Sequence, residues 1–212
     1  MTRTAVWLLG LLLGFFWVLP TVVTSTPSDL CKSVTTLKAS LNFTNRRQYM
    51  KHNFPINYTI RVHYEEIFRV HNISKLKARV QGLETRDLQE LWLLVNQEVL
   101  KKVLRVLPER HPSRKYTSDL EQLLRMVQQV FQQQQLQGPE NEEREPPERI
   151  QDIWDRVRDP DMRAWKSVRP KALLDNCYRT MHCLFQDCFQ SNEDFCSVLH
   201  WRRGNKKLPR QA

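Results

Sequence analysis

The sequence predicts an all-α protein, a four-helix bundle whose helices run up, up, down and down, with short β-strands in its long connections. Three observations predict this fold. Apolar residues recur every three or four positions over four long segments. Two of the three connections between these segments are long and the other is short. Prolines stand in the connections and at the first turn of the last segment, where they do not interrupt a helix.

Residues 1–25 have the order of a secretory signal peptide. Arg3 supplies a positive start, an apolar run extends to Leu19, and small polar residues follow. The alternative is a membrane anchor, but the run is shorter than the ~20 apolar residues that a spanning helix needs, and Pro20 interrupts it. We therefore expect a secreted, extracellular protein that is cleaved near Ser25 and does not insert into a membrane.

Four helical segments are expected in residues 26–196, which have the length of one domain with its own core. The second segment is the clearest, because acids occupy its first turn and bases its last, as the helix dipole favours. The predicted helices run from Asp29 to about Met50, from Glu84 to Leu107, from about Ser113 to Gln137 and from about Pro170 to Gln190.

Short strands are expected inside the two long connections. In the first, alternate residues from position 56 to position 64 are apolar and a proline stands at the start, which is typical of a short edge strand. In the second, an acidic, proline-rich linker at 138–148 and a short amphipathic segment at 149–159 precede a possible strand within 162–170. The alternating residues of the first strand are Ile56, Tyr58, Ile60, Val62 and Tyr64.

The lengths of the connections determine the expected topology. A long crossover leaves two consecutive helices parallel, whereas the short link at 108–113 forces the second and third helices to be antiparallel. An up-down-up-down bundle would not need two long connections. The expected architecture is therefore the short-chain, up-up-down-down bundle of helical cytokines.

Four of the five cysteines lie near the end of the chain. In an oxidising compartment such cysteines form disulfides. The alternative is a zinc site, which Cys183, Cys188, Cys196 and His200 could form, but these residues lack a C-x-x-C pair. We therefore expect disulfides.

The positions of the cysteines on the predicted helices indicate how they pair. On the fourth helix, Cys177 and Cys188 share the core stripe and Cys183 points away, and no two of the three are three or four residues apart. The first helix runs antiparallel to the fourth, so its start lies beside the end of the fourth. We predict a disulfide from Cys31 to Cys188 and one from Cys183 back to Cys196, with Cys177 as a buried thiol.

Sequons and charge indicate an extracellular protein with an anionic partner. The N-glycosylation sequons begin at Asn42, Asn57 and Asn72. A net charge of +10 favours sulfated glycans, such as heparan or chondroitin sulfate, over nucleic acid for a secreted protein. Residues 197–212 form a basic tail, for which the alternative is a disordered, solvated end. The candidate glycan-binding residues of the tail are Arg202, Arg203, Lys206, Lys207 and Arg210.

The sequence gives no support to an enzyme. It contains no G-x-S-x-G or H-E-x-x-H motif, no P-loop and no glycine-rich dinucleotide turn. Its five glycines leave little backbone that could surround a phosphate. We therefore expect no catalytic residues and no cofactor.

Four stretches of the chain resemble the interleukin-34 family, and together they extend from the first helix into the fourth. The resemblance implies a secreted, homodimeric four-helix cytokine that engages the colony-stimulating factor 1 receptor, a receptor tyrosine kinase, and promotes survival, proliferation and differentiation of monocytes and macrophages. The stretches are residues 47–76, 88–95, 111–116 and 167–177.

The chain also departs from the family pattern. Mammalian members carry a long tail rich in proline and serine, whereas this tail is short and basic, and the cysteines after Cys177 are spaced differently. The sequon at Asn72 matches a glycosylation position of the family. These features resemble a non-mammalian member.

The receptor surface is expected on side chains that the core stripe leaves outward on the first and third helices. Arginine is favoured because its planar guanidinium binds carboxylates through two hydrogen bonds and is enriched at interfaces. The alternative is that these are ordinary solvated residues. The candidate receptor-binding residues are Arg46, Arg47, Lys51, Arg125, Gln128 and Gln129.

Overall fold

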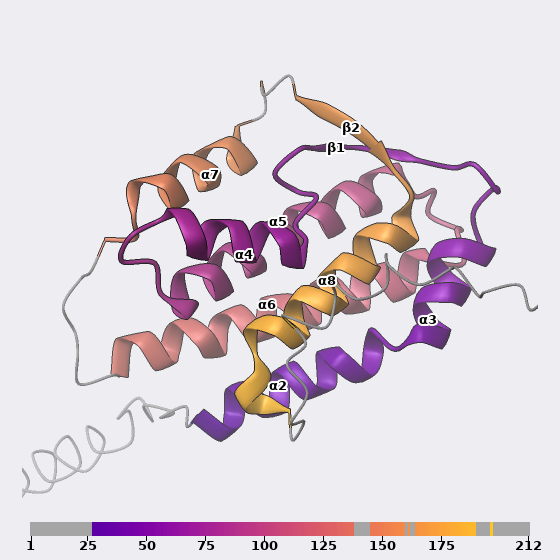
Figure 1. Cartoon of the computed structure of the whole chain (residues 1–212). Helices are drawn as coiled ribbons and strands as arrows, with labels where there is room; N and C mark the ends of the chain where they lie inside the picture. Colours follow the sequence, from indigo (N-terminus) through magenta and orange to yellow (C-terminus); the bar gives the residue numbers. More distant parts are fainter. Residues whose placement is uncertain (1–26, 138–144, 160, 162–163, 190–195, 197–212) are drawn as a thin grey trace, which may run out of the picture.

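The computed structural model describes residues 27–137, 145–159, 161, 164–189 and 196. Within these residues the chain is mostly helical, with one small antiparallel sheet (Figure 1). No helix in this part of the chain is both long enough and apolar enough to span a bilayer. The α-helices are α2 (Pro27–Ser40), α3 (Phe43–Arg47), α4 (Val70–Arg79), α5 (Thr85–Val106), α6 (Arg114–Gln137), α7 (Glu148–Arg158) and α8 (Pro170–Leu184).

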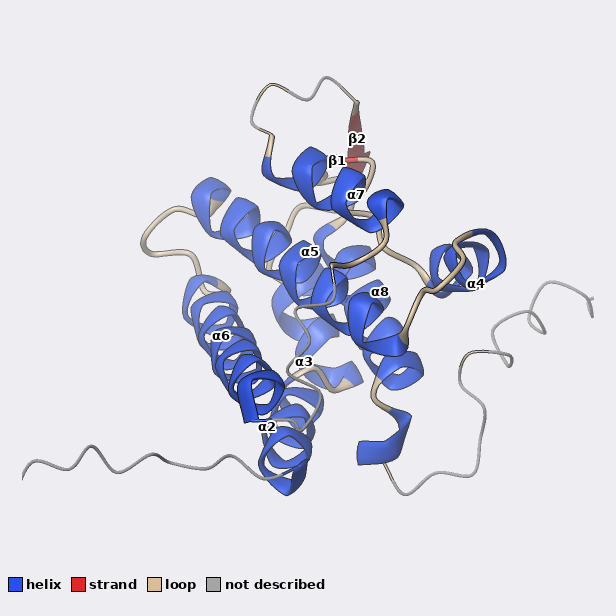
Figure 2. Ribbon diagram, turned by 90° about the vertical axis from the view of Figure 1, so that its left-hand side faces the viewer, coloured by secondary structure: helices blue, strands red, loops and turns tan. Residues whose placement is uncertain are grey.

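The helices α2, α5, α6 and α8 form the bundle, with α2 beside α6 and α5 beside α8 (Figure 2). Two contacts between helix ends and the short link between α5 and α6 give their directions. Tyr116 at the start of α6 donates to the carbonyl of Ser40 at the end of α2, at 3.0 Å. Gln89 near the start of α5 donates to the carbonyl of Leu184 at the end of α8, at 2.8 Å. Since the short link turns the chain back between α5 and α6, the four helices run up, up, down and down, as predicted.

The first predicted helix is not continuous. It ends at Ser40, and a second helix begins after Asn42, followed by a π-helical turn at Gln48–His52. The Asn42 side chain accepts the backbone N–H of Asn45 at 2.8 Å and donates to the carbonyl of Ala39 at 2.8 Å. Asparagine therefore ends one helix and caps the next, because its short amide competes with the helical hydrogen bonds.

Both predicted strands are present but short. β1 (Ile60–His63) pairs antiparallel with β2 (Trp165–Val168), so that Ile60 faces Val168 and His63 faces Trp165. The alternation predicted from position 56 to position 64 is too long, because β2 offers pairing partners to only four residues. Ile56 lies outside the strand and is 92% exposed.

The two crossovers also contain helices. The amphipathic segment predicted at 149–159 is α7, whereas α4 was not predicted. The α4 helix buries Val70 and Ile73 and packs Leu76 against the core, a spacing of three residues that is a weak helical signal in a short segment.

The fourth helix is shorter than predicted. It ends at Leu184 instead of Gln190, and a 3₁₀ turn at Gln186–Cys188 follows. Cys188 therefore lies after the helix, and Cys183 is buried instead of pointing away from the core. Because the chain changes direction after Leu184, the helical stripe that we extended to Cys188 does not continue.

Candidate functional site

Two disulfides fix the end of α8, and both join the predicted cysteines. Cys31 on α2 is bonded to Cys188, and Cys183 is bonded to Cys196. The first bond holds the start of α2 beside the turn that follows α8. Because Cys183, Cys188 and Cys196 are all oxidised, none of them is left as a thiolate ligand for the zinc site considered above.

The fifth cysteine, Cys177, is a free and buried thiol. Burial raises the pKa of Cys177 to about 12, although the nearby Arg46 acts in the opposite direction. The thiolate is the reactive form of cysteine, so this side chain is inert in the native protein.

Arg46 is buried, so the prediction that it faces outward is wrong. Only 6% of the residue is exposed. Its Nε donates to the carbonyl of Leu41 at 2.7 Å, its guanidinium pairs with Asp175 of α8, and it lies 4.4 Å from the ring centroid of Tyr178. Lys171 of α8 is a second partner of Asp175, at 2.6 Å. Arg46 therefore joins α3 to α8 and is not available to a receptor.

Arg47 and Lys51 are exposed, as predicted. The Nε of Arg47 donates to Nε2 of His52 at 3.1 Å. Lys51 lines a shallow hollow of about 310 Å³ between the π-helical turn and the start of α8. Lys171 and the exposed Ile56 also line this hollow, so the surface combines basic and apolar groups.

The other predicted residues lie on α6, next to α5. Arg125 is exposed and forms an ion pair with Glu121 one turn earlier on the helix. Gln128 is half-buried and accepts a hydrogen bond from Gln97 of α5, whereas Gln129 is exposed. A groove of about 390 Å³ between α5 and α6 contains Arg125. The predicted residues therefore form two surfaces, one at the α8 start and one along α6.

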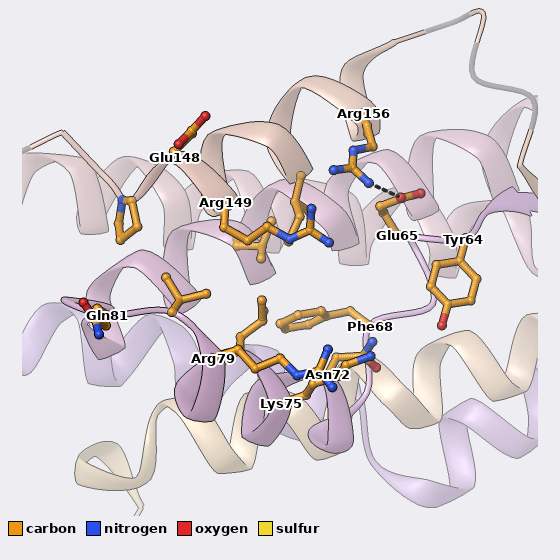
Figure 3. Close-up of a pocket in the computed structure, with 15 residues that line it drawn as sticks. Tyr64, Glu65, Phe68, Asn72, Lys75, Arg79, Gln81, Glu148, Arg149 and Arg156 are labelled. Carbon is orange, nitrogen blue, oxygen red and sulfur yellow. Dashed lines mark ion pairs between the residues drawn. The ribbon is translucent and has the colours of Figure 1, made fainter.

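A cleft of about 720 Å³ lies between α4 and α7 and contains none of the predicted receptor residues. Its floor is apolar, with Phe68 and Leu91 buried beneath it. Figure 3 shows Lys75 and Arg79 extending from α4 on one side, and Arg149 extending from α7 on the other. This cleft was not predicted because α4 was not, although the bases spaced four residues apart at 75 and 79 were a visible signal.

The described residues include no group of three or more metal-ligating side chains that could hold an ion. The features of this bundle are surface hollows with basic rims, which are suited to contacts with other macromolecules. The family whose model matches the sequence is described as interleukin 34, and the match covers residues 24–193.

The chain belongs to the interleukin-34 family. The match includes the whole bundle, from before α2 to beyond Cys188. This is a family of cytokines and not of enzymes, so the chain is a cytokine.

The sequons of this interleukin-34 chain differ in how their asparagines are bonded. Asn57 is exposed in a turn, and no hydrogen bond from its side chain to the described residues is present. Both side-chain atoms of Asn42 bond the backbone. Asn72 is half-buried and accepts the N–H of Arg69 at 3.1 Å through its oxygen, which leaves the nitrogen, the atom that carries a glycan, without a hydrogen bond to the described residues.

Several predictions fall on residues outside the described part of the interleukin-34 chain. They are the signal peptide at 1–25, His200 of the alternative zinc site, and the basic tail at 197–212 with its five candidate glycan-binding residues.

Proposed function

We propose that this protein is a secreted, homodimeric cytokine that binds the colony-stimulating factor 1 receptor and brings two copies of this receptor tyrosine kinase together. The single observation that carries the proposal is the interleukin-34 family match over the whole up-up-down-down bundle. The expected outcome is survival, proliferation and differentiation of monocytes and macrophages.

The proposed mechanism depends only on geometry. A two-fold symmetric ligand presents the same surface twice, so that it binds two receptor chains at once. Binding of the first chain raises the effective concentration of the second, and the two kinase domains then phosphorylate each other. No step of this mechanism requires a catalytic residue or a cofactor in the ligand.

Two surfaces are candidates for the receptor contact. The first contains Arg47 and Lys51 beside the exposed apolar side chain of Ile56. The second contains Arg125 and Gln129 on α6, with Gln128 behind them. Apolar anchors surrounded by basic residues are typical of interface hot spots, and arginine is enriched among them.

The surfaces are tested by charge reversal, with Arg47→Glu on one and Arg125→Glu on the other. Each variant should weaken binding to the immobilised receptor ectodomain by at least about 1 kcal/mol, roughly fivefold, with an unchanged melting temperature. Arg179→Glu, at an exposed position of α8, is the matched control. If both reversals bind within about threefold of wild type, the receptor contact lies elsewhere on the protein.

The function itself is tested by phosphorylation of the receptor in cells. The purified wild-type protein should induce receptor phosphorylation only in cells that express the colony-stimulating factor 1 receptor. A folded, dimeric protein that induces no phosphorylation in these cells would rule out the proposed receptor.

We further propose export of the chain. Cleavage of residues 1–25 would leave the cytokine domain at 26–196 and the basic tail at 197–212. The family supports this step, since cytokines act outside cells, and glycosylation at Asn42, Asn57 or Asn72 would require passage through the secretory pathway. N-terminal sequencing and glycosidase treatment of protein from the culture medium test both steps.

A second candidate function is glycosaminoglycan binding, which the net charge of +10 favours. Deleting residues 202–212 should lower the salt concentration that elutes the protein from heparin while receptor activation persists. Unchanged heparin retention would exclude the tail as the glycan-binding site.

A further inference from the structure

Another basic pocket lies at the sheet, separate from the hollow beside Lys51. It has a volume of about 370 Å³ and is enclosed by β1, β2, the second half of α5 and the end of α7. Four cationic side chains line it, one from β1, two from α5 and one from α7. They are Arg61, Lys102, Arg105 and Arg158.

The charge of this pocket is not balanced by its own acids. Glu98 forms an ion pair with Lys101 at 2.7 Å, and Asp159 accepts the backbone N–H of Asp161 at 2.8 Å. Lys102 is paired at 2.6 Å with the buried Glu66 beneath the pocket. None of the three arginines has a carboxylate of the described residues within ion-pair distance, although the charge of Arg158 acts on the carboxyl group of Glu90 on α5. Four cationic side chains therefore line the pocket against two acidic ones, and this excess of positive charge would be offset by an anion.

The pocket also contains an unsatisfied polar side chain. His63 of β1 lines the pocket, is only 2% exposed, and has no hydrogen-bond partner for either ring nitrogen among the described residues. A buried polar group without a partner is unfavourable, so an acceptor that came within hydrogen-bond distance of either ring nitrogen would offset this cost.

One wall of the pocket is an aromatic ring held in place from several sides. Trp165 of β2 packs against the His63 ring in an edge-to-face arrangement, with 4.1 Å between centroids. The Lys102 ammonium lies 4.9 Å from the centre of the Trp165 ring, and the Arg61 guanidinium lies 5.4 Å from it. Trp165 remains partly exposed, and a rigid, accessible tryptophan beside arginines is the composition of a protein-binding hot spot.

We propose that this pocket binds the carboxylate of an aspartate or glutamate side chain presented by a partner protein. The arginines would donate to the carboxylate oxygens, a ring N–H of His63 would donate to the same group, and Trp165 would pack on the aliphatic part of the side chain. The partner is therefore a protein with an acidic residue inside an apolar surface, and the proposal does not depend on the identity of the signalling receptor.

The residues around the pocket favour a partner protein over a sulfated glycan or a second copy of this chain. Val106 and Trp165 are two of the large apolar side chains that the described surface exposes, and both line the pocket. A sulfated glycan has no apolar surface of comparable size to cover them. A second copy of this chain, paired through the same surface, would bring the two sets of arginines together.

Fluorine NMR on the secreted protein labelled with 5-fluorotryptophan tests the proposal, with the Trp165 signal assigned from a Trp165→Phe variant. The probe is the peptide N-acetyl-Leu-Glu-Leu-amide, and its matched control is the peptide with glutamine in place of glutamate. We expect the glutamate peptide to shift the Trp165 signal saturably and to leave the Trp92 and Trp154 signals in place. In the Arg61→Gln/Arg158→Gln double variant, the dissociation constant should rise at least about fivefold. Arg179→Gln should bind the peptide like wild type.

Four outcomes would overturn the proposal. The glutamine peptide could shift Trp165 as strongly as the glutamate peptide, or the double variant could bind with unchanged affinity. The Trp165 signal could show no saturable shift up to about 10 mM peptide. A chondroitin sulfate disaccharide could bind more tightly than the glutamate peptide, which would make the pocket a glycan site. Both substituted arginines are exposed, and unchanged Trp92 and Trp154 signals would verify that the double variant is folded.

Discussion

Removing the buried guanidinium of Arg46 should destabilise the bundle severely. In Arg46→Ala, the carbonyl of Leu41 loses its donor, the ring of Tyr178 loses the cation packed on it, and Asp175 loses one of its two cationic partners. All three losses occur where the end of the first helical segment meets the start of α8. The fold should persist, because the disulfide at the opposite end of α8 still joins the two segments.

The expected loss of unfolding free energy in Arg46→Ala follows from the surroundings of Arg46. Breaking a buried ion pair by removing one partner costs roughly 3–5 kcal/mol. The Asp175 side chain is 23% exposed and keeps Lys171, so the lower end of that range, about 3 kcal/mol, is expected. For a domain of this size, 1 kcal/mol lowers the melting temperature by about 2–4 °C, which gives a decrease of about 6–12 °C.

The assay is urea unfolding at one protein concentration without reductant, with thermal melting alongside it. Arg47→Ala is the matched control, because this neighbouring arginine is exposed and its removal should change the free energy of unfolding by at most about 0.5 kcal/mol. Arg46→Lys should recover only part of the stability, since lysine keeps the charge and loses the planar guanidinium. Equal unfolding midpoints for Arg46→Ala and Arg47→Ala would refute the structural role of Arg46.

Further predictions concern the cysteines and one histidine. Replacing Cys31 and Cys188 by alanine should lower the free energy of unfolding by about 5 kcal/mol, since this disulfide spans 157 residues. Removing the second disulfide in the same way should lower it by about 3 kcal/mol, since that bond spans only 13 residues. The urea midpoints of the two double variants test this order. Burial lowers the pKa of His182 to about 4, so the unfolded chain takes up a proton below about pH 6.5 and the native chain does not. Stability should therefore fall from pH 6.5 towards pH 4, and His182→Phe should flatten this dependence. Iodoacetamide at pH 8 should leave Cys177 unmodified until the protein is unfolded, and rapid alkylation of the native protein would contradict its burial.

Neighbouring residues and connection lengths were enough to predict two of the helices, the topology and one disulfide. The helices at 85–106 and 114–137 begin and end within one residue of their predicted limits, because periodicity, charge order and flanking prolines all act locally. The two long connections then gave the up-up-down-down topology. That topology was enough to pair Cys31 with Cys188, since antiparallel helices bring the start of one beside the end of the other.

Two helix ends were predicted at the wrong residues, and side chains that compete locally for backbone hydrogen bonds explain part of this difference. The amide of Asn42 breaks a helix whose apolar spacing continues past it, and α8 ends before Cys188 although the apolar spacing continues to that residue. A helical pattern records which residues could share a face. Apolar spacing does not indicate the residue at which a side-chain hydrogen bond or a change in chain direction ends the helix.

The environment of individual charged residues could not be predicted, because it depends on contacts between distant parts of the chain. Arg46 and Arg47 are adjacent and chemically identical in the sequence, but Arg46 is buried against Asp175, which lies 129 residues away, and Arg47 is exposed. The pocket at the sheet likewise needs the pairing of His63 with Trp165 across two distant crossovers. The physical reason is that burial and ion pairing depend on the residues that the fold brings into contact, whereas periodicity reports only the face of one element.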